Sequence, residues 1–133
     1  VNWNANGYRL PTEAEWEKFS RGGFTGREYP WGDTIAASNA NYSAGGTVVA
    51  GSYPANGYGV HDAAGNVSEW CWDWFGSYTS RTDENPTGPA SGTARVIRGG
   101  TWSVAATNLR CSARASLAPG TSNTVAGLRC VRR

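Results

Sequence analysis

The clearest pattern of apolar and polar positions lies near the N-terminus, in the stretch RLPTEAEWEKFSRGG at residues 9–23. Thr12 can accept a hydrogen bond from the amide of Glu15 while the Glu15 side chain reaches back to the amide of Thr12, which is the reciprocal capping box. Trp16 and Phe19 then share one face, and the paired glycines that follow end the helix. The pattern predicts a helix of about eight residues, too short to be stable unless Trp16 packs against the rest of the fold.

A pattern of period two follows in NVSEWCWDWF, residues 66–75, and it predicts a strand. Three indoles alternate with smaller or acidic residues, so they fall on one face of that strand: Trp70, Trp72 and Trp74. We expect this face to be buried in the core. A platform of aromatic side chains for a ligand is the alternative interpretation.

Two further strands are predicted toward the C-terminus. ARVIRGGTW, residues 94–102, has the pattern of a short strand that runs into a glycine break. VAGLRCVRR, residues 125–133, has the pattern of a closing strand with Leu128 and Cys130 on one side and Arg129 on the other.

Residues 23–59 show no periodicity and are rich in turn motifs such as YPWGD and YPANGYG. The aromatic residues in this stretch favour an ordered loop region over a disordered one. With one helix, several short strands and long ordered loops, and with no internal repeat or linker, residues 1–133 are expected to form a single α+β domain.

Composition narrows the classes of function. The 133 residues carry a net charge of +2, and the 12 basic residues are scattered along the chain, which disfavours nucleic acid as a partner. No apolar run is long enough to span a membrane. The chain begins at Val1 with no visible signal peptide, so an export segment was either removed or never present.

Cysteine and histidine are sparse. The three cysteines form no Cys-x-x-Cys pair and the chain has one histidine, His61, so a zinc site is not expected. A disulfide between Cys111 and Cys130 would form in an oxidising compartment, and buried free thiols are the equal alternative.

A series of blocks then resembles a known family. RLPTEAEWE, RGG, YPWGD, NGYGVHDAAGNVSEW, NPTGPASGTARVIRGGTW and GLRCVR occur in the order typical of formylglycine-generating, sulfatase-modifying domains, which have a variant of the C-type lectin fold. The resemblance covers nearly the whole chain and implies that fold here. Family domains have a further strand and helix before the first block, which implies that the chain is the C-terminal part of a longer protein.

The oxidase branch of the family binds copper with two cysteines shortly after the RGG block. Here the corresponding residues 103–109 read Ser-Val-Ala-Ala-Thr-Asn-Leu and contain no thiolate for Cu(I), so neither copper nor formylglycine-generating activity is expected. Another branch holds iron with several histidines, which His61 alone cannot supply. The resemblance also gives Cys111 and Cys130 structural positions and places Ser20 where Cys111 has its usual disulfide partner. We therefore expect a protein that is not an enzyme.

The resemblance implies one structural calcium site, held by the side chains of Asp62 and Glu69 and by the carbonyl groups of Gly65 and Val67. Hard oxygen ligands around a flexible turn suit calcium. A capped turn, with Asp62 hydrogen-bonded to backbone amides, explains Asp62 equally well. The family's other calcium site would fall near Asn41 and Tyr42, where the loop that follows is shortened here.

From RGGTW onward the pattern is similar to the variable proteins of diversity-generating retroelements, whose randomised ligand-binding positions lie in this region. Arg110, Arg114 and Pro119 match framework positions, between which the residues are free to change. The resemblance implies a ligand-binding surface made of Trp102, Ser103, Val104, Ala105, Thr107, Asn108, Ala115, Ser116, Leu117, Ala118, Gly120, Thr121, Asn123, Thr124 and Val125.

We expect these side chains to form a shallow, largely preformed pocket with Trp102 as a rigid aromatic wall. The partner would be a protein or another surface ligand, with the cell surface or extracellular space as the expected location. Adenine-directed mutagenesis of asparagine codons cannot create Lys, Glu, Gln, Met or Trp, and residues 103–125 contain none of them, although the whole chain is poor in these residues. A binding or accessory module of fixed specificity is the alternative, followed by the oxidase.

Overall fold

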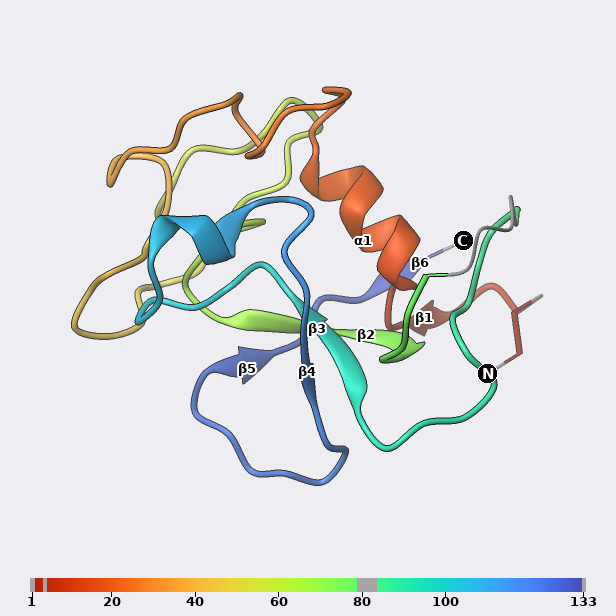
Figure 1. The fold of residues 1–133 in the computed structure, drawn as a ribbon. Helices are drawn as coiled ribbons and strands as arrows, with labels where there is room; N and C mark the ends of the chain where they lie inside the picture. The colour runs from red at the N-terminus through yellow and green to blue at the C-terminus, as the bar shows by residue number, and fades with distance from the viewer. Residues whose placement is uncertain (1, 4, 79–83, 133) are drawn as a thin grey trace.

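The computed structural model describes residues 2–3, 5–78 and 84–132 and is mostly sheet and loop with one α-helix (Figure 1). This confirms the expected α+β class. In chain order the elements are β1 (Tyr8–Arg9), α1 (Glu13–Ser20), β2 (Ser68–Trp74), β3 (Arg95–Arg98), the 3₁₀ helix η1 (Ala106–Leu109), β4 (Ala115–Leu117), β5 (Ala126–Gly127) and β6 (Val131–Arg132).

Four strands form the main sheet in the order β4-β3-β2-β5. The β2 strand is antiparallel to β3 and parallel to β5, and β3 is antiparallel to β4. A separate antiparallel pair joins β1 to β6, with Arg9 opposite Val131. In Figure 1 the long loops between α1 and β2 form one end of the molecule, while both chain termini lie on the right of the view.

The helix begins as the sequence predicted. The Thr12 hydroxyl accepts the Glu15 amide at 3.2 Å, and the Glu15 carboxylate accepts the Thr12 amide at 2.8 Å, which confirms the capping box. The helix ends at Ser20, with Arg21 as the C-cap residue before the glycine pair, and Gly22 has a φ of 58°. Trp16 is 1% exposed and packs with Cys71 and Val96, so the helix is held by the core against β2 and β3.

The strand at residues 66–75 forms, but the prediction that its tryptophans face the core is wrong. Glu69, Cys71 and Asp73 are buried, whereas Trp70, Trp72 and Trp74 are half-buried. The acidic side chains can be buried because each meets a donor: Trp16 Nε1 donates to Glu69 at 2.8 Å and the Glu13 amide donates to Asp73 at 2.8 Å.

The tryptophan face is instead partly covered by a cation. The Arg95 guanidinium lies 5.0 Å from the ring centroid of Trp72 and 3.6 Å from that of Trp74, and it also donates to the Trp72 carbonyl oxygen. Trp3 meets Trp72 edge-on, with 5.6 Å between ring centroids. Cation–π and edge contacts of this kind stabilise aromatic rings that are not fully buried.

The single closing strand predicted at residues 125–133 is also wrong, because the chain there is divided between two sheets. The β5 strand pairs with β2, while β6 pairs with β1. Between them Leu128 is 67% exposed, and Arg129 turns inward to bind the Glu69 carboxylate at 2.6 Å. This ion pair interrupts the alternation that the sequence pattern indicated.

The turn-rich residues 23–59 are ordered, as their aromatic content predicted. Tyr29 and Ala40 form a second buried cluster with Ala64 and Leu109, and four partly buried side chains pack around it: Trp31, Ile35, Tyr42 and Val104. The loop region is therefore built around its own small core, which reaches the C-terminal part of the chain through Leu109.

No disulfide joins Cys111 to Cys130 in this structure, and all three cysteines are free. Cys111 is buried while Cys130 is exposed. The thiol of Cys111 is close enough to the hydroxyl of Ser20, the residue that the family resemblance placed opposite it, for that hydroxyl to lower its pKa in part. Among the described residues, no helix combines the length and apolar character needed to cross a membrane.

Candidate functional site

Most side chains of the predicted binding surface point to solvent. The exposed members are Ser103, Ala105, Thr107, Asn108, Ala115, Ser116, Ala118, Gly120, Thr121, Asn123 and Thr124. Trp102, Val104, Leu117 and Val125 are half-buried, and Val104 packs against the second core cluster. In Figure 1 η1 and the chain between β4 and β5 lie on the left and lower left, away from both termini.

The first exposed segment comprises residues 103–108. Its backbone is fixed by neighbouring loops. The Trp102 amide donates to the Asn66 carbonyl oxygen at 2.9 Å, and the Trp102 carbonyl accepts the Ala44 amide at 2.8 Å. The Val104 carbonyl accepts the Ser43 amide at 3.0 Å. These bonds use main-chain atoms only, so they hold residues 102–104 whatever side chains stand there.

Asn66 connects this region to a further loop. It is 8% exposed and has a φ of 64°, a left-handed conformation that asparagine tolerates. Its side chain accepts the Val48 amide at 3.0 Å and donates to the Val48 carbonyl oxygen at 3.2 Å. The loop at residues 41–48 is therefore tied to the same residue whose carbonyl holds Trp102.

A buried arginine anchors the far end of the first segment. Arg98 has no exposed side-chain surface and donates to the carbonyl oxygens of Cys111 at 2.5 Å and Ser112 at 3.4 Å. Its charge is balanced by Glu17 at 2.7 Å and Glu13 at 3.2 Å, both on α1. The chain directly after η1 is thereby fixed to the helix.

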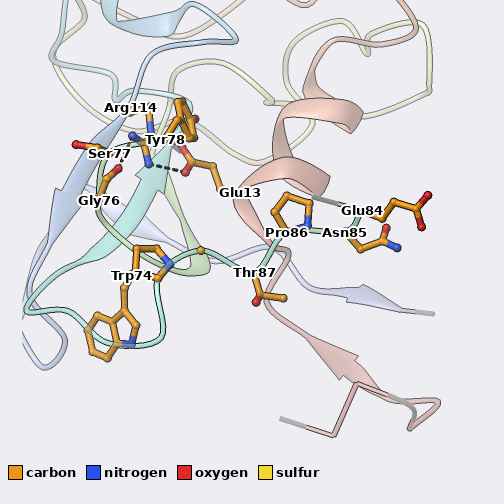
Figure 2. Close-up of a pocket in the computed structure, with 12 residues that line it drawn as sticks. Glu13, Trp74, Gly76, Ser77, Tyr78, Glu84, Asn85, Pro86, Thr87 and Arg114 are labelled. Atoms are coloured by element: carbon orange, nitrogen blue, oxygen red, sulfur yellow. Dashed lines mark hydrogen bonds and ion pairs between the residues drawn. The ribbon is translucent and has the colours of Figure 1, made fainter. Parts of the chain in front are cut away.

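A second arginine anchors the start of β4. Arg114 binds both carboxylate oxygens of Glu13, at 2.6 and 2.7 Å, and donates to the Gly76 carbonyl oxygen at 2.9 Å, as Figure 2 shows. Its guanidinium also lies 4.0 Å from the ring centroid of Tyr78. Although Tyr78 is 67% exposed, the loss of water on its covered side, and then the negative charge of Glu13, raise the pKa of Tyr78 to about 12.

The second exposed segment, residues 118–124, is held at both ends. Ala115, Ser116 and Leu117 pair with β3, and the Val125 carbonyl accepts the Ser68 amide at 2.9 Å. Residues 118–124 between these supports are all exposed. The segment is a surface loop whose two attachment points belong to the main sheet.

Five surface clefts stand out in the described part of the chain, and among residues 103–125 only Arg114 lines one of them. The cleft beside Arg114, about 620 Å³ in volume, is drawn in Figure 2; it lies between the Glu13–Arg114 pair and residues 84–89. The shallow pocket with Trp102 as its wall is not one of these five, so the exposed segments do not enclose any of these clefts.

The four residues implied for calcium line one cleft of about 400 Å³, together with His61 and Arg129. Asp62 has a φ of 53° and accepts the Gly51 amide at 2.6 Å, the bond that the capped-turn interpretation expects. Glu69 already accepts Arg129 at 2.6 Å and Trp16 at 2.8 Å. The donor set therefore fits calcium in part, because a dication would compete with the Arg129 guanidinium for Glu69.

The remaining implied or candidate ligands do not gather. Among the described residues, no group of three or more His, Cys, Asp and Glu side chains could hold a metal ion. His61 binds the Tyr53 carbonyl oxygen through Nδ1 at 2.8 Å. Asn41 is buried, and its side chain donates to the Gly46 carbonyl oxygen at 2.9 Å, so it supports the shortened loop.

The sequence did not reveal the residues whose side chains or carbonyl groups fix the backbone beneath the predicted binding surface, above all Glu13, Arg98 and Asn66. A signal was present, because Glu13 and Glu17 are four residues apart on one helix face and could receive a common cation. Nothing in the sequence indicated that this cation would be Arg98, 85 residues from Glu13.

Comparison with known proteins places this geometry in a family. The model of the sulfatase-modifying factor enzyme 1-like domain matches residues 1–133. The chain belongs to this family. Formylglycine-generating enzyme from Streptomyces coelicolor is 39% identical over 98% of the chain and 50% of that protein.

Within the sulfatase-modifying factor enzyme 1-like family, the chain is also similar to proteins with other names. The solved structure of Treponema denticola variable protein 1 superposes with a TM-score of 0.90 and 38% identity, over 98% of this chain and 49% of that one. The serine/threonine-protein kinase pkn1 of Chlamydia pneumoniae is 44% identical over 99% of the chain but only 23% of the kinase. The chain thus spans about a quarter to a half of these relatives, and its fold is the formylglycine-generating type of C-type lectin fold.

Proposed function

We propose that the chain is the ligand-binding part of a diversity-generating-retroelement variable protein, in which residues 103–125 carry the exchangeable positions. The observation that carries the proposal is the combination of the 0.90 TM-score to a variable protein with the exposure of eleven of the fifteen predicted binding residues. Main-chain bonds, a contact of the buried Arg98 and a contact of the partly buried Arg114 hold the backbone beneath them. Side chains can then change at little cost to the fold.

The cheapest test is the nucleotide sequence around the gene. The proposal requires a nearby repeat of the segment that encodes residues 103–125, differing from it at positions where the repeat has adenine. If a fully sequenced genome contains no such repeat, the retroelement proposal is wrong. The exposure of residues 103–125 would then need another explanation.

A binding or accessory module of fixed specificity is the second candidate. It is favoured by the 44% identity to a kinase of which this chain would cover only 23%, because a module joined to an enzyme has that proportion. Under this hypothesis the codons for residues 103–125 would be the same in every isolate, and sequencing several isolates separates the two candidates.

We also propose that the chain has no formylglycine-generating activity. Cys71 and Cys111 are buried, and burial raises the pKa of each thiol, which makes them poor copper ligands and nucleophiles. Incubation with copper and a sulfatase-type cysteine peptide should yield no aldehyde. Detection of the aldehyde by mass spectrometry would reinstate the oxidase.

The proposal also includes a calcium site and a location for the protein. We propose a weak structural calcium site at the cleft of Asp62 and Glu69, supported by the gathering of the four implied ligands there. Display at the cell surface suits a variable receptor, and fractionation of the native cells would test it. The ligand is a protein or another surface molecule.

A further inference from the structure

The surface that carries the exposed segments is almost free of charge. Residues 34–60, 99–109 and 115–128 contain no Asp, Glu, Lys or Arg. The ion pairs of α1, β2 and β3 lie elsewhere, in the network around Glu13 and Glu69. Within residues 99–113 the one charged side chain is Arg110, which follows η1 directly.

Arg110 differs from the other framework arginine of the segment. Arg114 is partly buried against Glu13, whereas Arg110 is exposed and makes one side-chain hydrogen bond, from Nε to the Thr107 carbonyl oxygen at 3.1 Å. Among the described residues Arg110 forms no ion pair and stacks on no aromatic ring. The Arg110 guanidinium therefore takes no part in the ion pairs that fix the backbone of this region.

A loop with an acidic residue meets the chain directly after Arg110, because the Glu28 carbonyl accepts the Cys111 amide at 2.7 Å. The Glu28 carboxylate makes no ion pair with Arg110 among the described contacts. Arg110 has no carboxylate bound to it and has uncharged residues on both sides of it in the chain, at 99–109 and 111–113, so its guanidinium is free to meet a carboxylate of a ligand. The Nε bond to Thr107 orients the guanidinium and leaves both Nη groups available for a carboxylate.

We propose that Arg110 is a constant anchor of the binding surface, and that its ligands are proteins that present an Asp or Glu carboxylate to it. The exchangeable side chains at 103–108 and 118–124 then supply the uncharged contacts around that pair. Arginine is enriched among the residues that dominate binding energy, and a guanidinium surrounded by neutral contacts that exclude water is the arrangement in which it contributes most. This inference rests on the proposed function.

A displayed library tests it. The exposed positions of residues 103–108, 118 and 120–124 are randomised with Arg110 and Pro119 kept, and binders are selected against serum albumin, an acidic protein, and against the same albumin with its carboxylates amidated. Each binder is then measured as Arg110→Gln and as Arg132→Gln. Arg132 is the matched control, because it is also exposed and its Nε also donates one 3.1 Å hydrogen bond, to Asn6.

We expect Arg110→Gln to weaken binding to native albumin by about tenfold or more, and Arg132→Gln by less than about twofold. Amidation of albumin should remove the difference between Arg110 and its Gln variant. Binders that keep their affinity as Arg110→Gln would overturn the anchor while leaving the proposed function intact. A folded library that yields no binder to either form of albumin would count against the proposed function and, with it, the anchor.

The fold of the variants is checked separately. Because Arg110 is exposed and makes a single hydrogen bond, Arg110→Gln should shift the melting temperature by no more than about 2 °C. Glu28→Gln should change affinity in the opposite direction, since removing a negative charge from the loop that meets Cys111 should tighten binding to native albumin. An unchanged affinity in Glu28→Gln together with an unchanged affinity in Arg110→Gln would exclude electrostatic recognition at this position.

Discussion

Glu13 receives the Arg114 side chain on both carboxylate oxygens, at 2.6 and 2.7 Å, although the two residues are 101 positions apart. The same carboxylate accepts the buried Arg98 at 3.2 Å and the Tyr78 hydroxyl at 3.1 Å. One side chain of α1 thus fixes the chain on both sides of residues 99–113. The first exposed segment begins and ends at supports that converge on Glu13.

Replacement of Glu13 by Gln should therefore destabilise the fold strongly. Glu13 is 6% exposed in its side chain and Arg98 is fully buried, so the substitution leaves a buried positive charge with less compensation. We expect a loss of about 3–5 kcal/mol in the free energy of unfolding, measured by urea denaturation.

Glu15→Gln is the matched control for this substitution. Glu15 binds Arg9 at the surface, with 41% of its side chain exposed, and glutamine preserves the capping box. The loss in the free energy of unfolding of Glu15→Gln should stay below about 1 kcal/mol. Equal losses in the two variants would contradict the role given to Glu13.

The contact between Ser20 and Cys111 predicts an engineered disulfide. Both residues are buried and the Ser20 hydroxyl is close enough to act on the Cys111 pKa, so Ser20→Cys should place two thiols near one another. Oxidation would close a loop of roughly ninety residues and stabilise the fold by up to about 4 kcal/mol. Thiol titration under denaturing conditions and thermal melts with and without reductant measure this. A variant that still has four free thiols after oxidation would show that the pair cannot bond.

Tyr78 should titrate abnormally. Its pKa is raised to about 12 by burial and by Glu13, so the neutral phenol is favoured in the folded state. The resulting stability is present below pH 10 and is lost as pH rises from 10 toward 12. The difference between the ultraviolet titrations of the native chain and of Tyr78→Phe should have its midpoint near pH 12, and a midpoint near pH 10 would contradict the contact between Tyr78 and Glu13.

Calcium should stabilise the chain only at high concentration. Arg129 already occupies the Glu69 carboxylate, so a dissociation constant of about 1 mM is expected, and 10 mM calcium would add about 1.4 kcal/mol to the free energy of unfolding. Asp62→Asn removes the charge but keeps a residue that tolerates the left-handed φ and can accept the Gly51 amide. This variant should lose the stabilisation by calcium. Magnesium at equal ionic strength is the control. A native chain that shows no thermal shift with 10 mM calcium would disprove the site.

The sequence predicted what depends on neighbours in the chain. The capping box of Thr12 and Glu15 lies within four residues, and the strands at 68–74 and 95–98 follow local patterns, so these elements form where they were expected. The exposure of residues 118–124 also follows from their small, polar and turn-forming side chains.

What the sequence could not predict depends on distant partners. Period two placed the tryptophans of β2 in the core, but Glu69 and Asp73 are buried because donors 53 and 60 residues away satisfy them. The closing strand divides because Arg129 meets Glu69, 60 residues earlier. The frame beneath the candidate site has the same origin, since Arg98 and Glu13 are brought together only by the fold.

The central claim is that this frame holds its main chain independently of the exposed side chains. The most direct measurement is the folded fraction of a library in which exposed residues of 103–108 and 118–124 are randomised together, read by protease resistance and thermal melts. A second library randomises the buried residues Leu109 and Cys111 and should be mostly unfolded. We predict that most members of the first library keep a melting temperature within about 5 °C of the native chain. A first library that is as unfolded as the second would contradict the account.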